Sequence, residues 1–189
     1  MFMIVEGVDG AGKTTFAEHF AQLYGARVVH RGPPRLHPLW EYEHLDVEEP
    51  SYRELVVDPE ALVVADRWHW GELVYGPLLR GSSRLSPGGR WHVDAYLASR
   101  SAGLVWLDVP SRIAADRVRS RGDTLIPDTM ITQLRSGYVA VYGDRRMSPL
   151  IVWRSPSNDE RCAVTAYSSL RFGWRRPITA RSYVGPLHP

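Results

Sequence analysis

The stretch 6-EGVDGAGKTT-15, from Glu6 to Thr15, lies between a short apolar run and an amphipathic segment of the chain. Its part from Gly7 to Thr14 matches the pattern G-x-x-x-x-G-K-[ST] in full. Glycines let such a loop wrap tightly and bring backbone N–H groups against phosphate oxygens, and the following helix adds its positive dipole end. The stretch therefore predicts a strand, a phosphate-binding loop and a helix in succession.

The loop pattern also assigns roles to its side chains. It places the Lys13 ammonium at the β and γ phosphates of a nucleotide, and the Thr14 hydroxyl on Mg²⁺. We therefore expect ATP and Mg²⁺ as cofactors. The expected cofactor-binding residues are Gly7, Asp9, Gly10, Ala11, Gly12, Lys13, Thr14 and Thr15.

Short apolar runs alternate with helical patterns along the chain, which is typical of a parallel sheet covered by helices. The expected strands are Phe2–Glu6, Arg27–His30, Ala61–Asp66, Leu104–Val109 and Leu150–Trp153. The expected helices are Lys13–Tyr24, Leu39–Val56, Trp91–Ser101, Ser111–Arg121 and Asp128–Tyr142, and Arg80–Arg90 is an expected loop. This alternation predicts an α/β fold with a five-stranded parallel sheet and helices on both faces. Residues 1–153 form this domain, and 154–189 form a basic, linker-like tail.

Composition excludes several classes of function. Of the 23 basic residues among 189, Lys13 is the one lysine and the other 22 are arginines. Outside the loop no lysine remains for a Schiff base, a Ser-Lys pair or a protein-kinase strand. The Asn-Lys-x-Asp box of GTPases is also absent, and the single cysteine, Cys162, permits neither an internal disulfide nor a cysteine metal site.

Charge and hydropathy restrict the classes of binding partner and the cellular compartment that we expect. The net charge is +2, and residues 154–189 carry six arginines against two acidic residues. The main body is therefore not a basic nucleic-acid module, while the tail is either a phosphate contact or a solvated basic end. No apolar stretch is of membrane-spanning length and the chain begins directly in a strand-like run, which predicts a cytoplasmic protein without a membrane partner.

Asp66-Arg67-Trp68 stands at the end of the third expected strand, where ligands gather in open parallel sheets. A carboxylate there can orient Mg²⁺ or the acceptor oxygen, so Asp66 joins Thr14 as a candidate metal residue. An arginine there can fork onto an acceptor phosphate. A structural ion pair is the alternative for this dipeptide.

Together these motifs resemble the thymidylate kinases, in the subgroup whose phosphate loop lacks arginine. The resemblance covers about residues 2–153 and includes Tyr75 nine residues after Asp66, but Gly71 stands where the family has serine. It implies that Asp9 lies near the acceptor sugar and the metal-bound phosphate, that Arg67 holds the acceptor phosphate, and that Tyr75 lies under the deoxyribose.

Two further segments match the family in part. Arg31-Gly32-Pro33 stands where the family has Arg-Glu-Pro, so Arg31 is a candidate nucleotide contact or part of a backbone-fixing segment. The task of the missing glutamate could pass to Glu41, Glu43 or Glu72. Trp68 and Trp70 are candidate substrate-binding residues that stack on a base, with core packing as the alternative.

The segment from Leu104 to Asp123 resembles the family's fourth strand and lid entrance. The resemblance therefore implies an α/β P-loop kinase fold with a short arginine-bearing lid. Arg117 and Arg121 are four residues apart, so they share one helix face, while Arg119 points aside. Clamping arginines stabilise a phosphoryl group in transfer. The alternative is a solvated helix face whose arginines pair with Asp116 and Asp123.

These inferences predict a kinase that moves the ATP γ-phosphoryl to a deoxynucleoside monophosphate, dTMP or a 5-modified pyrimidine relative. The expected catalytic residues are Lys13, Asp9, Arg67, Arg117 and Arg121. Two alternatives stay open: a kinase for a nucleoside or for a modified base hydroxyl in DNA, and a nucleotide-binding regulatory module without turnover. The resemblance also implies a homodimer.

Overall fold

The computed structural model describes residues 2–30, 61–99, 102–122, 126–144 and 151–155. The strands are β1 (Phe2–Glu6), β2 (Arg27–His30), β3 (Val63–Asp66), β4 (Gly103–Leu107) and β5 (Ile151–Ser155). They form a parallel sheet in the order β2-β3-β1-β4-β5. β1 is therefore central, and the loop that follows it emerges from the middle of the sheet.

The sequence of each strand fits its place in this sheet. Every residue of β1, β3 and β4 is buried, as expected for strands covered on both faces. The edge strand β2 alternates between half-buried and exposed residues instead. The register places His30 opposite Asp66 and Asp66 opposite Val5. The polar carboxyl ends of β1, β2 and β3 therefore lie side by side at the same end of the sheet.

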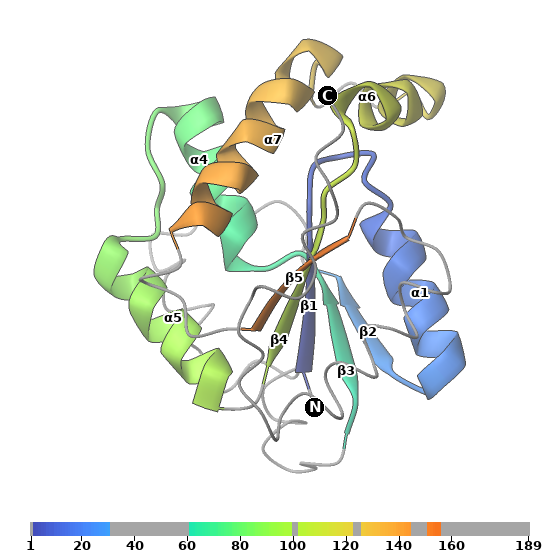
Figure 1. Cartoon of the computed structure of the whole chain (residues 1–189), viewed down its shortest axis with the longest axis vertical. Helices are drawn as coiled ribbons and strands as arrows, with labels where there is room; N and C mark the ends of the chain where they lie inside the picture. Colours follow the sequence, from blue (N-terminus) through green and yellow to red (C-terminus); the bar gives the residue numbers. More distant parts are fainter. Residues whose placement is uncertain (1, 31–60, 100–101, 123–125, 145–150, 156–189) are drawn as a thin grey trace.

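Five described helices surround the sheet: α1 (Lys13–Tyr24), α4 (His69–Arg80), α5 (Pro87–Ser99), α6 (Ser111–Ser120) and α7 (Asp128–Gly143). Figure 1 shows α1 on one side of the sheet and α4, α5 and α7 on the other. α6 lies across the end toward which the strands run, at the top of the view. This end of the sheet also holds the phosphate loop.

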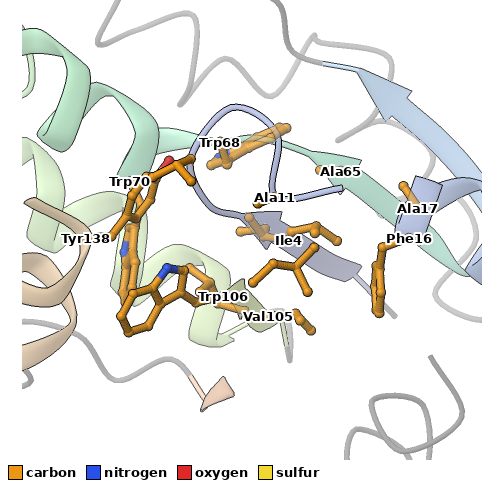
Figure 2. Packing of buried hydrophobic residues seen from close by; sticks show 14 of the residues in the cluster. Ile4, Ala11, Phe16, Ala17, Ala65, Trp68, Trp70, Val105, Trp106 and Tyr138 are labelled. Carbon is orange, nitrogen blue, oxygen red and sulfur yellow. The ribbon is translucent and has the colours of Figure 1, made fainter. Parts of the chain in front are cut away.

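The core lies on both faces of β1. Phe16 and Phe20 of α1 are fully buried, with ring centroids 6.2 Å apart. Trp106 of β4 and Tyr138 of α7 stack with centroids 6.4 Å apart. Figure 2 shows Phe16, Trp106 and Tyr138 packed around the central strand and its loop. The strand that leads into the loop is therefore packed by aromatic side chains on both of its faces.

The expected parallel α/β architecture is confirmed, with differences at several elements. α4 was not predicted, because Gly71, Gly76 and Pro77 interrupt its helical pattern. The loop expected over Arg80–Arg90 ends at Ser86, and Pro87 begins α5. β5 continues to Ser155, two residues past the expected domain end. The expected helix Leu39–Val56 and the tail from residue 156 lie outside the described residues.

Candidate active site

The phosphate loop closes around the chain's one lysine. Lys13 Nζ donates hydrogen bonds to the carbonyl oxygens of Gly7 and Val8, both at 2.8 Å, and lies 4.0 Å from Asp9 Oδ1. The side chain is 5% exposed. Burial, followed by the nearby Arg67 guanidinium, lowers the pKa of Lys13 to about 8 despite the opposing carboxylates. The ammonium thus occupies the loop in which phosphate oxygens would bind.

Glycine is required in this loop by close contacts. A Cβ on Gly10, whose φ is +80°, would lie 2.2 Å from the carbonyl oxygen of Ala114 in α6. Arg117 of the same helix donates a hydrogen bond from Nη1 to the Gly10 carbonyl oxygen at 3.1 Å. The base of α6 is therefore packed directly on the loop, and the structure brings the predicted lid residue Arg117 to the phosphate site.

Asp9, Arg67 and Tyr75 form one cluster at the mouth of the loop. Arg67 Nη2 pairs with Asp9 Oδ1. The Tyr75 hydroxyl accepts a hydrogen bond from the Asp9 N–H and donates one to Asp9 Oδ2, both at 3.1 Å. The Arg67 guanidinium also lies 5.8 Å from the centre of the Tyr75 ring. Three predicted site residues, distant in sequence, therefore meet.

Charge in this cluster is balanced around Asp9. Burial alone would raise the pKa of Asp9, but Arg67 and then Lys13 hold it below its ordinary value. Burial, followed by the Asp9 carboxylate, raises the pKa of the Tyr75 hydroxyl far above its usual range. Asp9 is therefore a carboxylate and Tyr75 a neutral phenol at neutral pH.

The backbone of Arg67 is in the left-handed region, with φ of +73°. Among the described non-glycine residues no other has a positive φ. Its N–H is held by the Val5 carbonyl oxygen at 2.9 Å, which fixes the turn from β3 into α4. Such strain costs about 1–3 kcal/mol and is found most often at functional sites. Here it aims the guanidinium back toward the loop.

Thr14 and Asp66 also meet, as the sequence predicts for a metal site. Thr14 Oγ1 donates to Asp66 Oδ2 at 2.6 Å, and His30 Nδ1 lies 3.0 Å from the same oxygen. Asp66 Oδ1 is buried and has no hydrogen-bond partner among the residues that the structure describes. An unsatisfied carboxylate oxygen beside a threonine hydroxyl fits Mg²⁺, which binds through few protein oxygens plus phosphates and water.

His30 is a residue of this site that the sequence did not reveal, because its signal is only its position at the end of β2. In the described part of the chain, no three His, Cys, Asp or Glu side chains are grouped to hold a metal by themselves. The two-residue arrangement of Thr14 and Asp66 therefore requires phosphate and water to complete a coordination sphere.

Trp68 and Trp70 are 3% and 1% exposed. Figure 2 shows both side chains among the buried residues of the core. Trp68 makes an edge contact with Phe2 at 5.2 Å between centroids. The structure therefore supports core packing, not base stacking, for both indoles. Glu72 is also committed elsewhere: its carboxylate pairs with Arg80 and accepts the Arg84 N–H at 2.8 Å, so it holds the turn after α4.

The remaining predicted site residues lie on the surface of the protein or outside the described residues. Arg121 ends α6 and is exposed, one turn beyond Arg117. Arg119 pairs with Asp116 at 2.9 Å on the exposed face, as the solvated-helix alternative has it. Arg31, Glu41 and Glu43 lie outside the described residues, as does Asp123. None of the described helices is long and apolar enough to cross a membrane.

Comparison with known proteins fits this geometry. No protein-family model matches the chain. A probable thymidylate kinase from Archaeoglobus fulgidus is 30% identical over 143 residues, which cover 65% of this chain and 71% of that protein. The YorR protein of Bacillus subtilis, solved with phosphorylated GDP, superposes with a TM-score of 0.72 at 17% identity, covering 94% of this chain and 99% of that one.

A deoxyadenosine kinase from M. mycoides, solved with the products dCMP and dCDP, has a TM-score of 0.55 at 15% identity, with 89% of this chain and 97% of that chain covered. At these identities the two solved structures show the fold alone. The curated relative and the complete phosphate loop together indicate phosphotransfer of the nucleotide kinase type. The chain therefore belongs to the thymidylate kinase-like family of P-loop kinases.

Proposed function

We propose that the protein transfers the γ-phosphoryl group of ATP to a deoxynucleoside monophosphate, dTMP or a 5-modified pyrimidine relative. The observation that carries this proposal is the Arg67–Asp9–Tyr75 cluster beside the phosphate loop. It supplies a guanidinium fork for an acceptor phosphate within reach of the donor site. The 30% identical relative named a probable thymidylate kinase supports the same acceptor class.

The charge on Asp9 favours a phosphate acceptor over a hydroxyl acceptor. A nucleoside hydroxyl must lose its proton to a general base, whereas a phosphate oxygen is already an anion. Arg67 and Lys13 keep the pKa of Asp9 low against the effect of burial, so its carboxylate is a weak base. Asp66, at the end of β3, accepts a hydrogen bond from the Thr14 hydroxyl, so this carboxylate is already engaged at the proposed metal site.

In the proposed reaction an oxygen of the acceptor phosphate attacks the γ-phosphorus. The bond from that phosphorus to the β–γ bridging oxygen breaks, and ADP leaves with its electron pair. Lys13 leaves the Gly7 and Val8 carbonyls to bind the β and γ phosphates, and Arg117 covers the transferred group. Thr14 and Asp66 would hold Mg²⁺, which neutralises phosphate charge when bound.

Exclusion of water and placement of the acceptor complete the proposal. ATP hydrolysis competes unless the site is closed, and α6, which contacts the loop through Ala114 and Arg117 and is followed by Arg121, is the element that we propose covers it. Arg67 holds the acceptor phosphate, and Tyr75 lies against the sugar. Arg31 is an additional proposed nucleotide contact.

The test measures ADP formation from Mg-ATP with deoxynucleoside monophosphates, nucleosides and modified oligonucleotides as acceptors. We expect turnover with pyrimidine monophosphates. Turnover with nucleosides or oligonucleotides alone would overturn the proposal, and ATP binding without any phosphorylated acceptor would indicate a regulatory module.

Arg67→Ala supplies the matched test of the acceptor site. It is expected to raise the KM of the acceptor about tenfold or more while the KM of ATP changes little, because a charge-assisted contact is lost on one side only. Arg119→Ala, which removes an exposed ion pair with Asp116, is the control. Acceptor kinetics equal in both variants would remove Arg67 from the site.

A further inference from the structure

Glu6 is a buried carboxylate that the proposed reaction does not use. It is the last residue of β1, directly before the phosphate loop, and is fully buried. Its Oε1 accepts hydrogen bonds from the Trp68 N–H at 2.8 Å and the Gly71 N–H at 3.1 Å. Its Oε2 accepts one from the Tyr138 hydroxyl at 3.0 Å. One side chain therefore joins β1, α4 and α7.

These contacts supply a cap that α4 itself lacks. Trp68 occupies the N-cap position and makes no side-chain capping bond. The first N–H groups of a helix have no partner within it, and an anion there also interacts favourably with the helix dipole. Burial raises the pKa of Glu6, and the Trp68 and Gly71 N–H groups partly offset that rise. The cap of α4 thus comes from the strand that carries the phosphate loop.

The capped turn holds the acceptor residues on both of its sides. Arg67, in its left-handed conformation, precedes the turn and pairs with Asp9. Tyr75 follows on the same helix and bonds Asp9 through its hydroxyl. Both residues thus depend on where the first turn of α4 lies relative to β1. Glu6 joins the two directly, because its side chain accepts hydrogen bonds from the backbone of this turn.

We infer that Glu6 is a positioning residue: it holds α4, and with it Arg67 and Tyr75, at the separation from the phosphate loop that lets acceptor and donor phosphates react. The inference rests on the proposed kinase function. It assigns no contact with substrate to Glu6. Misplacement of reacting groups by about 1 Å can cost on the order of 100-fold in rate, so a remote support of this kind has a measurable effect.

This role requires the length of the glutamate side chain, not its negative charge. Glu6→Gln keeps the chain length and an amide oxygen that can accept both backbone N–H groups, while its amide nitrogen faces the Tyr138 hydroxyl. Glu6→Asp keeps the carboxylate but is shorter by one methylene, so its oxygens withdraw from Trp68 and Gly71. The two variants therefore separate the effect of side-chain length from the effect of charge, and both keep a polar side chain at position 6.

The experiment measures, for wild type and both variants, the kcat/KM of the acceptor, the Kd of ATP and the melting temperature. We expect Glu6→Asp to lower the acceptor kcat/KM about 10- to 100-fold, since two buried hydrogen bonds lengthen, with the Kd of ATP within about threefold of wild type. Glu6→Gln should restore the acceptor kcat/KM to within about threefold of wild type.

A lower melting temperature with unchanged acceptor kinetics would show a merely structural role and overturn the inference. Equal losses in Glu6→Asp and Glu6→Gln, or equal losses for acceptor and ATP, would overturn it as well. The wild-type arm keeps the two proposals apart: no product with any monophosphate contradicts the proposed function, whereas wild-type turnover that Glu6→Asp leaves unchanged contradicts only the role of Glu6.

Discussion

Replacement of Gly10 by alanine tests whether α6 is packed on the phosphate loop. Gly10 and Gly25 both have positive φ, +80° and +66°. A Cβ on Gly10 would lie 2.2 Å from the Ala114 carbonyl oxygen, whereas a Cβ on Gly25 meets nothing within 4 Å. Gly25→Ala is therefore a control that shares the backbone strain and lacks the collision.

The magnitudes follow from these two geometries. The left-handed conformation costs an alanine about 1–2 kcal/mol at either position. The collision at Gly10 adds about 1–3 kcal/mol, because backbone atoms of Ala114, unlike a flexible side chain, must move. For a chain of this size each kcal/mol corresponds to about 2–4 °C in Tm, so Gly10→Ala should melt about 2–12 °C below Gly25→Ala.

Thermal unfolding followed by circular dichroism compares the two variants, and a nucleotide titration supplies a second measurement. Displacement of α6 carries Arg117 away from the Gly10 carbonyl, so ATP should bind Gly10→Ala about tenfold more weakly or worse, and Gly25→Ala as the wild type does. Equal melting temperatures together with equal ATP affinity would refute the packing of α6 on the loop as the reason for glycine at position 10.

Two further predictions concern the cations of the donor site. Burial lowers the pKa of Lys13 to about 8, so in the free protein the ammonium is present below that pH and lost above it. ATP affinity, measured by titration calorimetry at a series of pH values, should therefore fall about tenfold per pH unit above 8. An ATP affinity that does not change with pH would contradict this role of Lys13. Arg117→Ala should lower kcat about 10²–10³-fold, because Arg117 lies on the loop where the phosphoryl group is transferred. The control Arg119→Ala breaks an exposed ion pair with Asp116 and should change kcat by less than about twofold. Similar losses of kcat in the two variants would contradict the assignment of Arg117.

Local sequence was sufficient for the elements that carry continuous patterns. The exact bounds of β1, α1 and β2 could be predicted, because apolar runs and glycines mark their ends and Gly25 terminates α1 in the left-handed conformation. The family resemblance implied that Asp9 and Arg67 share the acceptor site, and they meet because the neighbouring parallel strands β1 and β3 bring their carboxyl ends to the same end of the sheet.

Local sequence patterns do not predict α4, because the contacts that stabilise this helix come from elsewhere in the chain. Gly71, Gly76 and Pro77 argue against a helix, yet Glu6 caps its first turn and Glu72 ties its end to the following loop. A Cβ on Gly76 would lie 2.6 Å from Glu72 Oε1, so this glycine makes room for a contact that the sequence does not announce.

The start of α5 did have a signal that could have been used. Ser86 precedes Pro87, the favoured order of N-cap and first helical residue, and Ser86 Oγ accepts the Gly89 N–H at 3.0 Å. The helix then carries Asp94, which pairs with His69 of α4 at 2.6 Å with both side chains fully buried. Such a buried pair across two helices follows from packing alone, and no spacing along the sequence predicts it.

The choice of lysine at position 13, in a chain that otherwise uses arginine, follows from the geometry of the loop. Two carbonyl oxygens, of Gly7 and Val8, receive one nitrogen at 2.8 Å inside a space that leaves 5% of the side chain exposed. A planar guanidinium presents its donors in a fixed fork and does not fit two convergent acceptors as a compact ammonium does. The ammonium can also exchange these carbonyls for phosphate oxygens by rotation of a flexible stem. Arginine suits position 67 for the converse reason, since its guanidinium pairs with Asp9 through Nη2 and its planar fork matches the acceptor phosphate proposed there, so the two cations of this site are not interchangeable.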